Sequence, residues 1–162
     1  LRMTNCTVSR NEPTGSLRSI VTNDGTAQLF YVSIVAHTGH DALLTTADGR
    51  TWMAHCLLSE PVDCRGEIIS YGGNWISSYG NGCQFAAVSD SLNRYVDASA
   101  MRYKGGFTPV HPFSTFDNRF MDKAPPVIVE AKDQTGSPRF VDGDNDGKAW
   151  PDPGAWEAPA NN

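Results

Sequence analysis

The chain has no long hydrophobic run and no excess of basic residues. No window of its 162 residues holds the roughly 18 consecutive apolar residues that a membrane span needs, and the first ten residues lack the apolar run of a signal peptide. The 13 Lys and Arg are outnumbered by 18 Asp and Glu, which gives a formal net charge of −5, and they are scattered along the sequence. Because nucleic acids attract basic surfaces, we expect no nucleic-acid partner, and we expect no membrane span in this chain.

Sequence motifs of familiar metal and protease sites are also missing. No Cys-x-x-Cys pair occurs, which argues against a structural zinc site, and neither His-Glu-x-x-His nor Gly-Asp-Ser-Gly-Gly is present. His37, His40 and His55 follow no zinc-binding spacing. We therefore expect these three histidines to have packing or surface roles.

Four cysteines are present, which is an even number in a loop-rich chain. This pattern is typical of proteins in an oxidising compartment, so we expect an extracellular, cell-surface or periplasmic location. Three pairings are possible, and we favour a Cys56–Cys64 disulfide that closes a short loop across Pro61, with Cys6–Cys83 as the second bond. Each disulfide would stabilise the fold by about 2–4 kcal/mol.

The composition predicts a single domain built from short strands and turns. The chain contains 15 Gly and 10 Pro, and 40% of its residues are hydrophobic. Residues 17–36 and 41–58 each hold two β-rich runs, separated by Asp24-Gly25 and Asp48-Gly49, and Asp-Gly is a preferred dipeptide of tight hairpin turns. We therefore predict a mainly β fold, a meander or sandwich-like sheet of hairpins with at most one short helix, and we keep an α+β fold as the alternative.

Further along the chain the pattern becomes less regular. A short helix is expected near residues 84–94 and a strand at 126–131, with a long aromatic loop at 104–125 between them. The expected single domain, residues 1–162, would have an N-terminal arm at 1–15 and a calcium-loop and tail region at 140–162.

The stretch FVDGDNDGKAWPD, residues 140–152, resembles the start of a calcium-binding loop. Such a loop offers oxygen ligands at positions 1, 3 and 5, a glycine for the bend at 6 and a backbone carbonyl at 7. Pro153 stands at position 12, where an EF-hand loop has its glutamate, so Asp152 is expected to complete the ligand shell. The predicted ligands of a structural Ca²⁺ are Asp142, Asp144, Asp146, Lys148 through its carbonyl, and Asp152. A solvated acidic turn without an ion is the alternative.

Two segments resemble parts of papain-like cell-wall amidases. GHDALL, residues 39–44, is similar to their His-bearing strand, and NGCQFAAVSDSL, residues 81–92, is similar to the start of the helix that carries their cysteine. The resemblance implies a Cys83 nucleophile activated by His40. A disulfide at Cys83 would exclude this mechanism.

Aromatic residues are gathered in a glycine-rich stretch, as Tyr71, Trp75 and Tyr79. Such rings often stack on sugars or fill a protein interface, so these three are candidate binding residues. Because they recur every four residues, an ordinary core or edge face is the alternative.

Together these features predict an extracytoplasmic, disulfide-stabilised β domain with a structural calcium loop. We expect it to act in binding, adhesion or pilin-like filament assembly, with a protein or glycan partner or with further copies of itself, rather than as an enzyme. A secreted cysteine hydrolase with a Cys83/His40 pair and a glycan-binding module are the alternatives.

Overall fold

The structure is a computed structural model that describes residues 1–11, 19–35, 41–59, 62–77, 87, 89–92, 101–112, 121–125 and 130–160. Within these ranges the chain forms strands and no helix, so the predicted mainly β fold is confirmed. No helix in this part of the chain is long and apolar enough to cross a membrane. The strands are β1 (Arg2–Ser9), β2 (Ser19–Asn23), β3 (Thr26–Val35), β4 (Asp41–Thr45), β5 (Arg50–Ala54), β6 (Leu57–Ser59), β7 (Val62–Arg65), β8 (Ile68–Gly72), β9 (Trp75–Ile76) and β10 (Ser91–Leu92).

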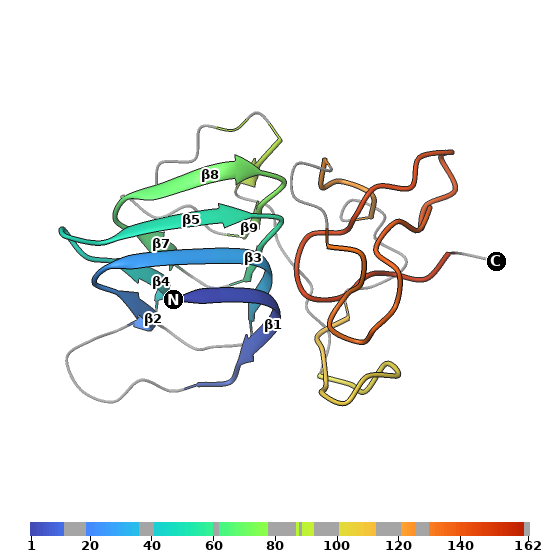
Figure 1. The fold of residues 1–162 in the computed structure, drawn as a ribbon, viewed down its shortest axis with the longest axis horizontal. Helices are drawn as coiled ribbons and strands as arrows, with labels where there is room; N and C mark the ends of the chain where they lie inside the picture. Colours follow the sequence, from blue (N-terminus) through green and yellow to red (C-terminus); the bar gives the residue numbers. More distant parts are fainter. Residues whose placement is uncertain are drawn as a thin grey trace.

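The ladders between these strands are all parallel. Paired residues of β1 and β3 lie 26 positions apart in the chain, those of β3 and β5 lie 24 apart, and those of β5 and β8 lie 17 apart before a register shift. One sheet runs in the order β10-β9-β6-β3-β5-β8 with β1 also on β3, and the second runs β2-β4-β7. The chain therefore winds as stacked coils, a parallel β-solenoid that occupies one half of the molecule (Figure 1).

The expected hairpins are wrong, because the Asp-Gly pairs form corners of the coil. β2 and β3 flank Asp24-Gly25 but belong to different sheets, and the next coil repeats the corner at Asp48-Gly49. The corners stack closely: Arg50 N donates to Gly25 O at 2.7 Å, and a Cβ on Gly49 would lie 2.5 Å from Asn23 O. Glycine is needed at this second corner because only its missing side chain allows that approach.

A second stacked corner uses left-handed backbone. Asn5, Tyr31, His55 and Gly73 have φ of 52°, 54°, 55° and 70°, and the strand registers place them at successive levels of the stack. Left-handed φ is uncommon outside glycine, so its repetition at one level after another indicates a bend that the whole stack enforces. At this bend each coil turns, so that β5 and β6, and likewise β8 and β9, lie on either side of it.

Apolar side chains fill the interior of the coils. β3 is buried along almost its whole length, as expected for a central strand of a parallel sheet. The main cluster comprises Leu29, Val32, Ile34, Leu43, Met53, Cys56, Leu58, Ile68 and Ile76. A second cluster joins the solenoid to the C-terminal segment through Val35, Leu57, Trp75, Val110, Met121, Trp156 and Ala158.

Neither expected disulfide is formed among the described residues, where Cys6 and Cys56 are free thiols. Cys56 lies inside the stack, where its Sγ contacts Leu29 O at 3.3 Å, whereas the backbone of Cys64 belongs to β7 of the other sheet. The structure therefore does not form the proposed Cys56–Cys64 bond. Cys83, the expected partner of Cys6, lies outside the described residues, so the second pairing stays a prediction.

Three expected elements also differ from the structure. Residues 2–9 of the expected N-terminal arm form β1, a strand of the larger sheet. Ser91–Leu92, placed in the expected helix, pair with β9 as a short strand. Of the expected strand at 126–131, positions 126–129 lie outside the described residues and 130–131 are not in a strand.

Candidate functional site

The acidic loop curls around its own carboxylates. Asp142 accepts hydrogen bonds from Asp146 N at 3.1 Å and from Gly147 N at 3.0 Å, one on each carboxylate oxygen. Asn145 and Gly147 adopt left-handed φ of 59° and 88°. Asn and Gly are the residues that tolerate this conformation best, so the alternation of acidic and small residues makes the tight curl possible.

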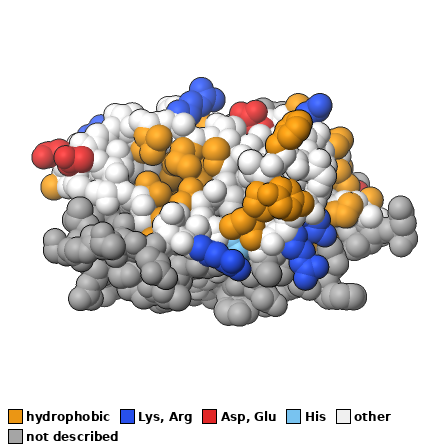
Figure 2. Space-filling view, turned by 90° about the horizontal axis from the view of Figure 1, so that it is seen from below, with side chains coloured by type: hydrophobic (Ala, Val, Ile, Leu, Met, Phe, Trp, Pro, Cys, Tyr) orange, Lys and Arg blue, Asp and Glu red, His pale blue; other side chains and the backbone are white. Residues whose placement is uncertain are grey.

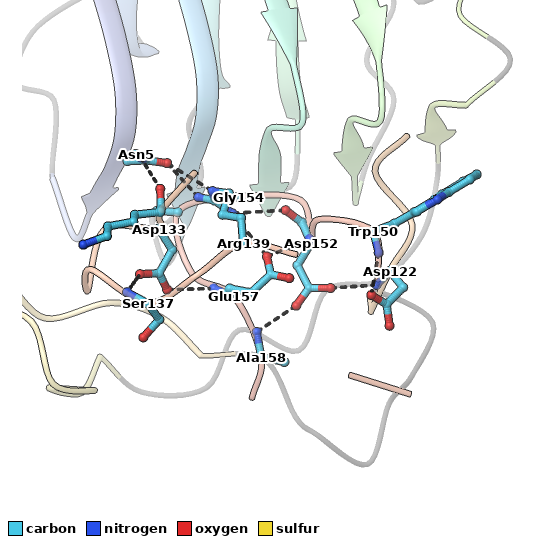
Figure 3. A network of polar contacts seen from close by, with 12 residues as sticks. Asn5, Asp122, Asp133, Ser137, Arg139, Trp150, Asp152, Gly154, Glu157 and Ala158 are labelled. Carbon is cyan, nitrogen blue, oxygen red and sulfur yellow. Dashed lines mark hydrogen bonds and ion pairs between the residues drawn. The ribbon is translucent and has the colours of Figure 1, made fainter. Parts of the chain in front are cut away.

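Asp122 brings a carboxylate from another part of the chain to this loop. Its Oδ2 accepts hydrogen bonds from Gly143 N at 2.9 Å and Asp144 N at 3.2 Å, and its Oδ1 accepts one from Trp150 N at 3.1 Å. One buried side chain therefore ties down both ends of the loop, as the contact with Trp150 in Figure 3 illustrates. Asp122 lies in no motif, so sequence reasoning missed it.

Three of these carboxylates form a group that can hold a cation. Oxygen atoms of Asp122, Asp142 and Asp144 all lie within 4.8 Å of one another, and a set of carboxylate oxygens suits a hard cation such as Ca²⁺. Lys123 Nζ lies 3.2 Å from Asp144 Oδ2, so positive charge is already present at the rim. Burial raises the pKa of Asp122, and the charge of Asp144 raises it further, which a bound cation would oppose.

The other predicted ligands lie around this group rather than in it. Asp146 is not among the three converging carboxylates; its Oδ1 accepts a hydrogen bond from Lys148 N at 2.9 Å. Asp152, expected to complete the shell, is buried elsewhere and accepts hydrogen bonds from Asp122 N and Ala158 N, both at 2.8 Å. Its carboxylate belongs instead to a second group with Asp122 and Glu157.

A fully buried arginine holds this second group together (Figure 3). Arg139 donates to Asn5 Oδ1 at 2.7 Å and to Gly154 O at 2.9 Å, and one of its nitrogens lies 3.5 Å from Glu157 Oε2. Its guanidinium also stacks on the Tyr31 ring, 3.9 Å from the centroid. Arg139 therefore joins the C-terminal segment to the first two coils of the solenoid.

The pKa values of two acidic groups in this network are strongly raised. Burial raises the pKa of Glu157 to about 10, with a further contribution from the charge of Asp152, while Arg139 opposes the shift. Burial likewise raises the pKa of Asp152 to about 7. One oxygen, Glu157 Oε1, has no hydrogen-bond partner within the described residues. Oxygens of Asp152 and Glu157 lie within 4.8 Å of each other, and two buried carboxylates this close resist ionising together, which favours a proton on the pair.

The candidate binding aromatics separate in the structure. Tyr71 is exposed on β8, whereas Trp75 is 6% exposed and packs in the cluster that joins the two halves, as an ordinary core residue does. Tyr79 lies outside the described residues. A cavity of about 340 Å³ opens elsewhere, and its lining includes Lys104, Pro138, Val141 and Trp156.

Cys83 and His40, the residues of the hydrolase alternative, lie outside the described residues. Of the described cysteines, Cys56 is fully buried, and burial raises its pKa to about 12, so that thiol is not a nucleophile. His55 is also buried and stacks on Tyr31 with ring centroids 4.6 Å apart, which agrees with the expected packing role.

No family model, no curated protein and no solved structure matches this chain.

Proposed function

We propose that this chain is an extracytoplasmic binding or assembly module in which a structural calcium ion fixes the C-terminal segment against a β-solenoid. The observation that carries the proposal is the convergence of Asp122, Asp142 and Asp144 on one point. Asp142 and Asp144 belong to the loop, whereas Asp122 comes from a separate segment. An ion there cross-links two parts of the chain.

Electrostatics supports an ion at this point. Three carboxylates that meet within 4.8 Å repel one another unless a cation or a proton neutralises them. The carboxylate oxygens of Asp122 accept hydrogen bonds from three backbone N–H groups, which fixes the position of this side chain before an ion binds. Extracellular calcium modules bind with a Kd on the order of 10⁻⁴–10⁻³ M, and a site of that affinity would be filled outside the cytoplasm.

The test is calorimetric titration with Ca²⁺, combined with thermal unfolding. At a Ca²⁺ concentration of about 30 times Kd, binding to the folded state alone stabilises it by about 2 kcal/mol. Asp144→Asn removes one converging charge and is expected to weaken binding at least about tenfold, because calcium affinity follows ligand charge.

Asp48→Asn is the matched control, since Asp48 is an exposed aspartate at a solenoid corner, far along the chain from the acidic loop. It removes the same charge and should leave the Ca²⁺ affinity unchanged. Equal loss of affinity in both variants would indicate non-specific attraction to an acidic protein. An unfolding temperature that stays the same when Ca²⁺ or a chelator is added would contradict the proposal.

A glycan-binding role remains the second candidate, now at a different place. The cavity is lined by Trp156, which is 5% exposed, and by Lys104, whose ammonium lies over that ring at 5.7 Å from its centroid. A cation beside an apolar wall suits a sugar that carries a carboxylate. Titration with neutral and acidic oligosaccharides, followed by tryptophan fluorescence, tests it. Lys104→Ala should weaken only the acidic sugars, and a signal that Lys104→Ala leaves unchanged places the glycan elsewhere.

The cysteine-hydrolase alternative needs a reactive thiol at Cys83. Alkylation of the native protein at neutral pH, with each cysteine followed by mass spectrometry, tests that requirement. Preferential labelling of Cys83 would favour the hydrolase, and labelling no faster than that of Cys6 would argue against it.

A further inference from the structure

Three carboxylates meet in the interior of the C-terminal half. Oxygen atoms of Asp122, Asp152 and Glu157 all lie within 4.8 Å of one another, and these residues are 5%, 2% and 3% exposed. We call these three residues the buried acidic group. The loop group described above differs from it, since Asp142 and Asp144 are only partly buried. Asp122 belongs to both groups, so the chain concentrates carboxylates at two neighbouring places.

Backbone N–H groups fix the buried acidic group and leave part of its acceptor capacity free. Asp152 accepts one hydrogen bond on each oxygen, from Asp122 N and from Ala158 N, both at 2.8 Å. Glu157 Oε2 accepts one from Asp152 N at 2.9 Å. Because a carboxylate has about four lone-pair sites on its two oxygens, these side chains can bind a ligand and keep the hydrogen bonds that position them.

One oxygen of the buried acidic group independently indicates a ligand. Glu157 Oε1 is buried and has no hydrogen-bond partner within the described residues. Arg139 and Asp152 N both contact the other oxygen, Oε2. In Figure 3 the Glu157 carboxylate points toward that of Asp152, into the group. A buried charged oxygen that stays unpaired is destabilising, so contact with a cation would stabilise the fold.

The charges of the buried acidic group do not balance. Three ionised carboxylates carry three negative charges, and Arg139, 3.5 Å from Glu157 Oε2, supplies one positive charge. Lys123 contacts Asp144 of the loop group instead. The two remaining negative charges lie in an environment where unpaired charge is strongly unfavourable. A divalent cation neutralises both of them at once, and protons are the alternative.

We propose that the buried acidic group binds a Ca²⁺ ion between Asp122, Asp152 and Glu157. Carboxylate oxygens suit a hard cation, and Ca²⁺ takes about six to eight oxygens, most of which three bidentate carboxylates can supply. Mg²⁺ usually keeps several water ligands, for which a group this buried has little room. This ion is separate from the loop calcium proposed above and does not require an ion in the loop.

The position of this ion gives it a role at the junction of the two halves. Glu157 pairs with Arg139, and Arg139 donates to Asn5 of β1 and stacks on Tyr31 of β3. An ion that fixes the Glu157 carboxylate therefore also fixes the arginine that reaches the solenoid.

Retention of Ca²⁺ after desalting tests the proposal. The chain is loaded with Ca²⁺, passed into calcium-free buffer and examined by elemental analysis. We expect about one Ca²⁺ to remain per chain, because a buried ion leaves only through local opening, whereas an ion bound with a Kd on the order of 10⁻⁴–10⁻³ M is lost. Desalted protein that holds no Ca²⁺ would overturn the buried site. The loop calcium has its own test in calorimetric titration, so failure of either site is seen separately.

Glu157→Gln removes one charge of the group and should retain less than about a tenth as much Ca²⁺, because calcium affinity follows ligand charge. The glutamine oxygen can still accept from Asp152 N, and the amide can donate toward the Asp152 carboxylate, so this variant should fold. Asp144→Asn alters only the loop group and should retain the buried ion. A variant Glu157→Gln that holds as much Ca²⁺ as the original chain would contradict the proposal.

Glu67→Gln is the matched control, since the Glu67 side chain is 56% exposed and pairs only at the surface with Arg50. It makes the same chemical change and should retain the ion. On the face shown in Figure 2 the described Asp and Glu side chains form small, separate patches, which offer little to hold an adventitious ion through desalting. An equal loss of Ca²⁺ from Glu67→Gln and Glu157→Gln would assign the ion to the surface and overturn the buried site.

A measurement on the original chain does not depend on the folding of any variant. Tb³⁺ replaces Ca²⁺ at oxygen sites, and two indoles are placed to sensitise its luminescence: Trp156 is adjacent to Glu157, and Trp150 N contacts Asp122. Luminescence decay in H₂O and in D₂O reports how many waters bind the ion. A component with few or no water ligands is expected from the buried acidic group. Luminescence from strongly hydrated Tb³⁺ alone would show that this group takes up no ion.

Discussion

The solenoid and the C-terminal segment are held together by different kinds of contact. In the solenoid, apolar side chains at equivalent positions of successive coils form one continuous cluster. The C-terminal segment, residues 130–158, has no strand, and only an isolated bridge between Lys132 and Pro138 interrupts its irregular path (Figure 1). In this segment, carboxylates rather than neighbouring strands accept many of the backbone hydrogen bonds. Asp133 alone accepts four, from Thr135 N and Oγ1, Ser137 N and Glu157 N.

This difference in contacts determines how each half responds to a substitution. In the solenoid each coil contacts its neighbours through many weak apolar contacts, so the stabilisation is spread along the stack. In the C-terminal segment a few buried polar groups each hold several chain segments, and removing one leaves the others unpaired in an apolar environment. The segment also reaches across the coils, since Gly154 N donates to His55 O at 2.6 Å and Ala155 N donates to Ser33 Oγ at 2.9 Å.

The largest effect is expected from breaking the buried arginine network. Arg139→Gln removes the cation that faces Glu157 and the donors to Asn5 and Gly154. Loss of one partner of a buried ion pair costs about 3–5 kcal/mol, because the remaining charge stays desolvated. Hydrogen exchange should show residues 130–158 losing protection, while amides of β3 and β5 retain theirs.

Two further variants separate burial from charge. Arg50→Gln breaks an exposed ion pair with Glu67, 3.6 Å apart, and should cost less than about 1 kcal/mol. The double variant Arg139→Leu with Glu157→Leu should cost less than Arg139→Gln alone, because both partners of the ion pair are then removed together. A double variant that is as unstable as the sum of its single variants would indicate that the pair does not interact.

The local sequence predicted strands and turns but not which strands pair. Asp24-Gly25 and Asp48-Gly49 are favourable turns in a hairpin and in a solenoid corner alike, so turn chemistry does not choose between them. The deciding signal was their separation, because 24 residues is also the offset between paired residues of β3 and β5. The nearly unbroken apolar run of β3 was a second signal, since strands buried on both faces are typical of parallel sheets.

The candidate metal site was predictable only where its residues are close in sequence. Asp142 and Asp144 were found because a calcium loop has a fixed local spacing. Asp122 is 20 positions before Asp142 and no motif includes it, so only the folded chain shows that it faces the loop. Arg139 was missed for a different reason: arginine is almost never fully buried, and its partners Asn5 and Glu157 lie at opposite ends of the sequence.

A cavity in the solenoid core should lower the free energy of unfolding by a similar amount, but hydrogen-exchange protection should be lost over a larger part of the chain. Leu29→Ala removes a fully buried side chain from the main cluster and is expected to cost about 2–5 kcal/mol in unfolding free energy. Because the C-terminal segment docks on the solenoid, protection from hydrogen exchange should fall in both halves, unlike in Arg139→Gln. Thr26→Ala, at the exposed start of β3, should stay within about 0.5 kcal/mol. Loss of protection confined to β1, β3 and β5 would show that the segment folds without the solenoid.

The last effect depends on pH, and it arises at the contact between the two halves. Burial lowers the pKa of His55 to about 4, and the charge of Arg139 contributes, so the folded chain binds this proton less readily than the unfolded chain, whose His55 has an ordinary pKa near 6.5. The contribution of neutral His55 to stability is therefore complete above pH 6.5 and is lost as the pH falls toward 4, by about 2–3 kcal/mol. Asp152 acts in the opposite direction, because its pKa is raised to about 7 and its contribution to stability weakens as the pH rises from about 4 to 7.

The dependence of the unfolding free energy on pH contains both effects, and a comparison with His55→Asn separates them. Asn tolerates the left-handed φ of 55° at this position and does not titrate, so denaturant unfolding of both proteins at pH 7 and pH 4 gives a difference that should shrink at the lower pH. A difference that stays constant across this range would mean that His55 takes up its proton in the folded chain as easily as in water.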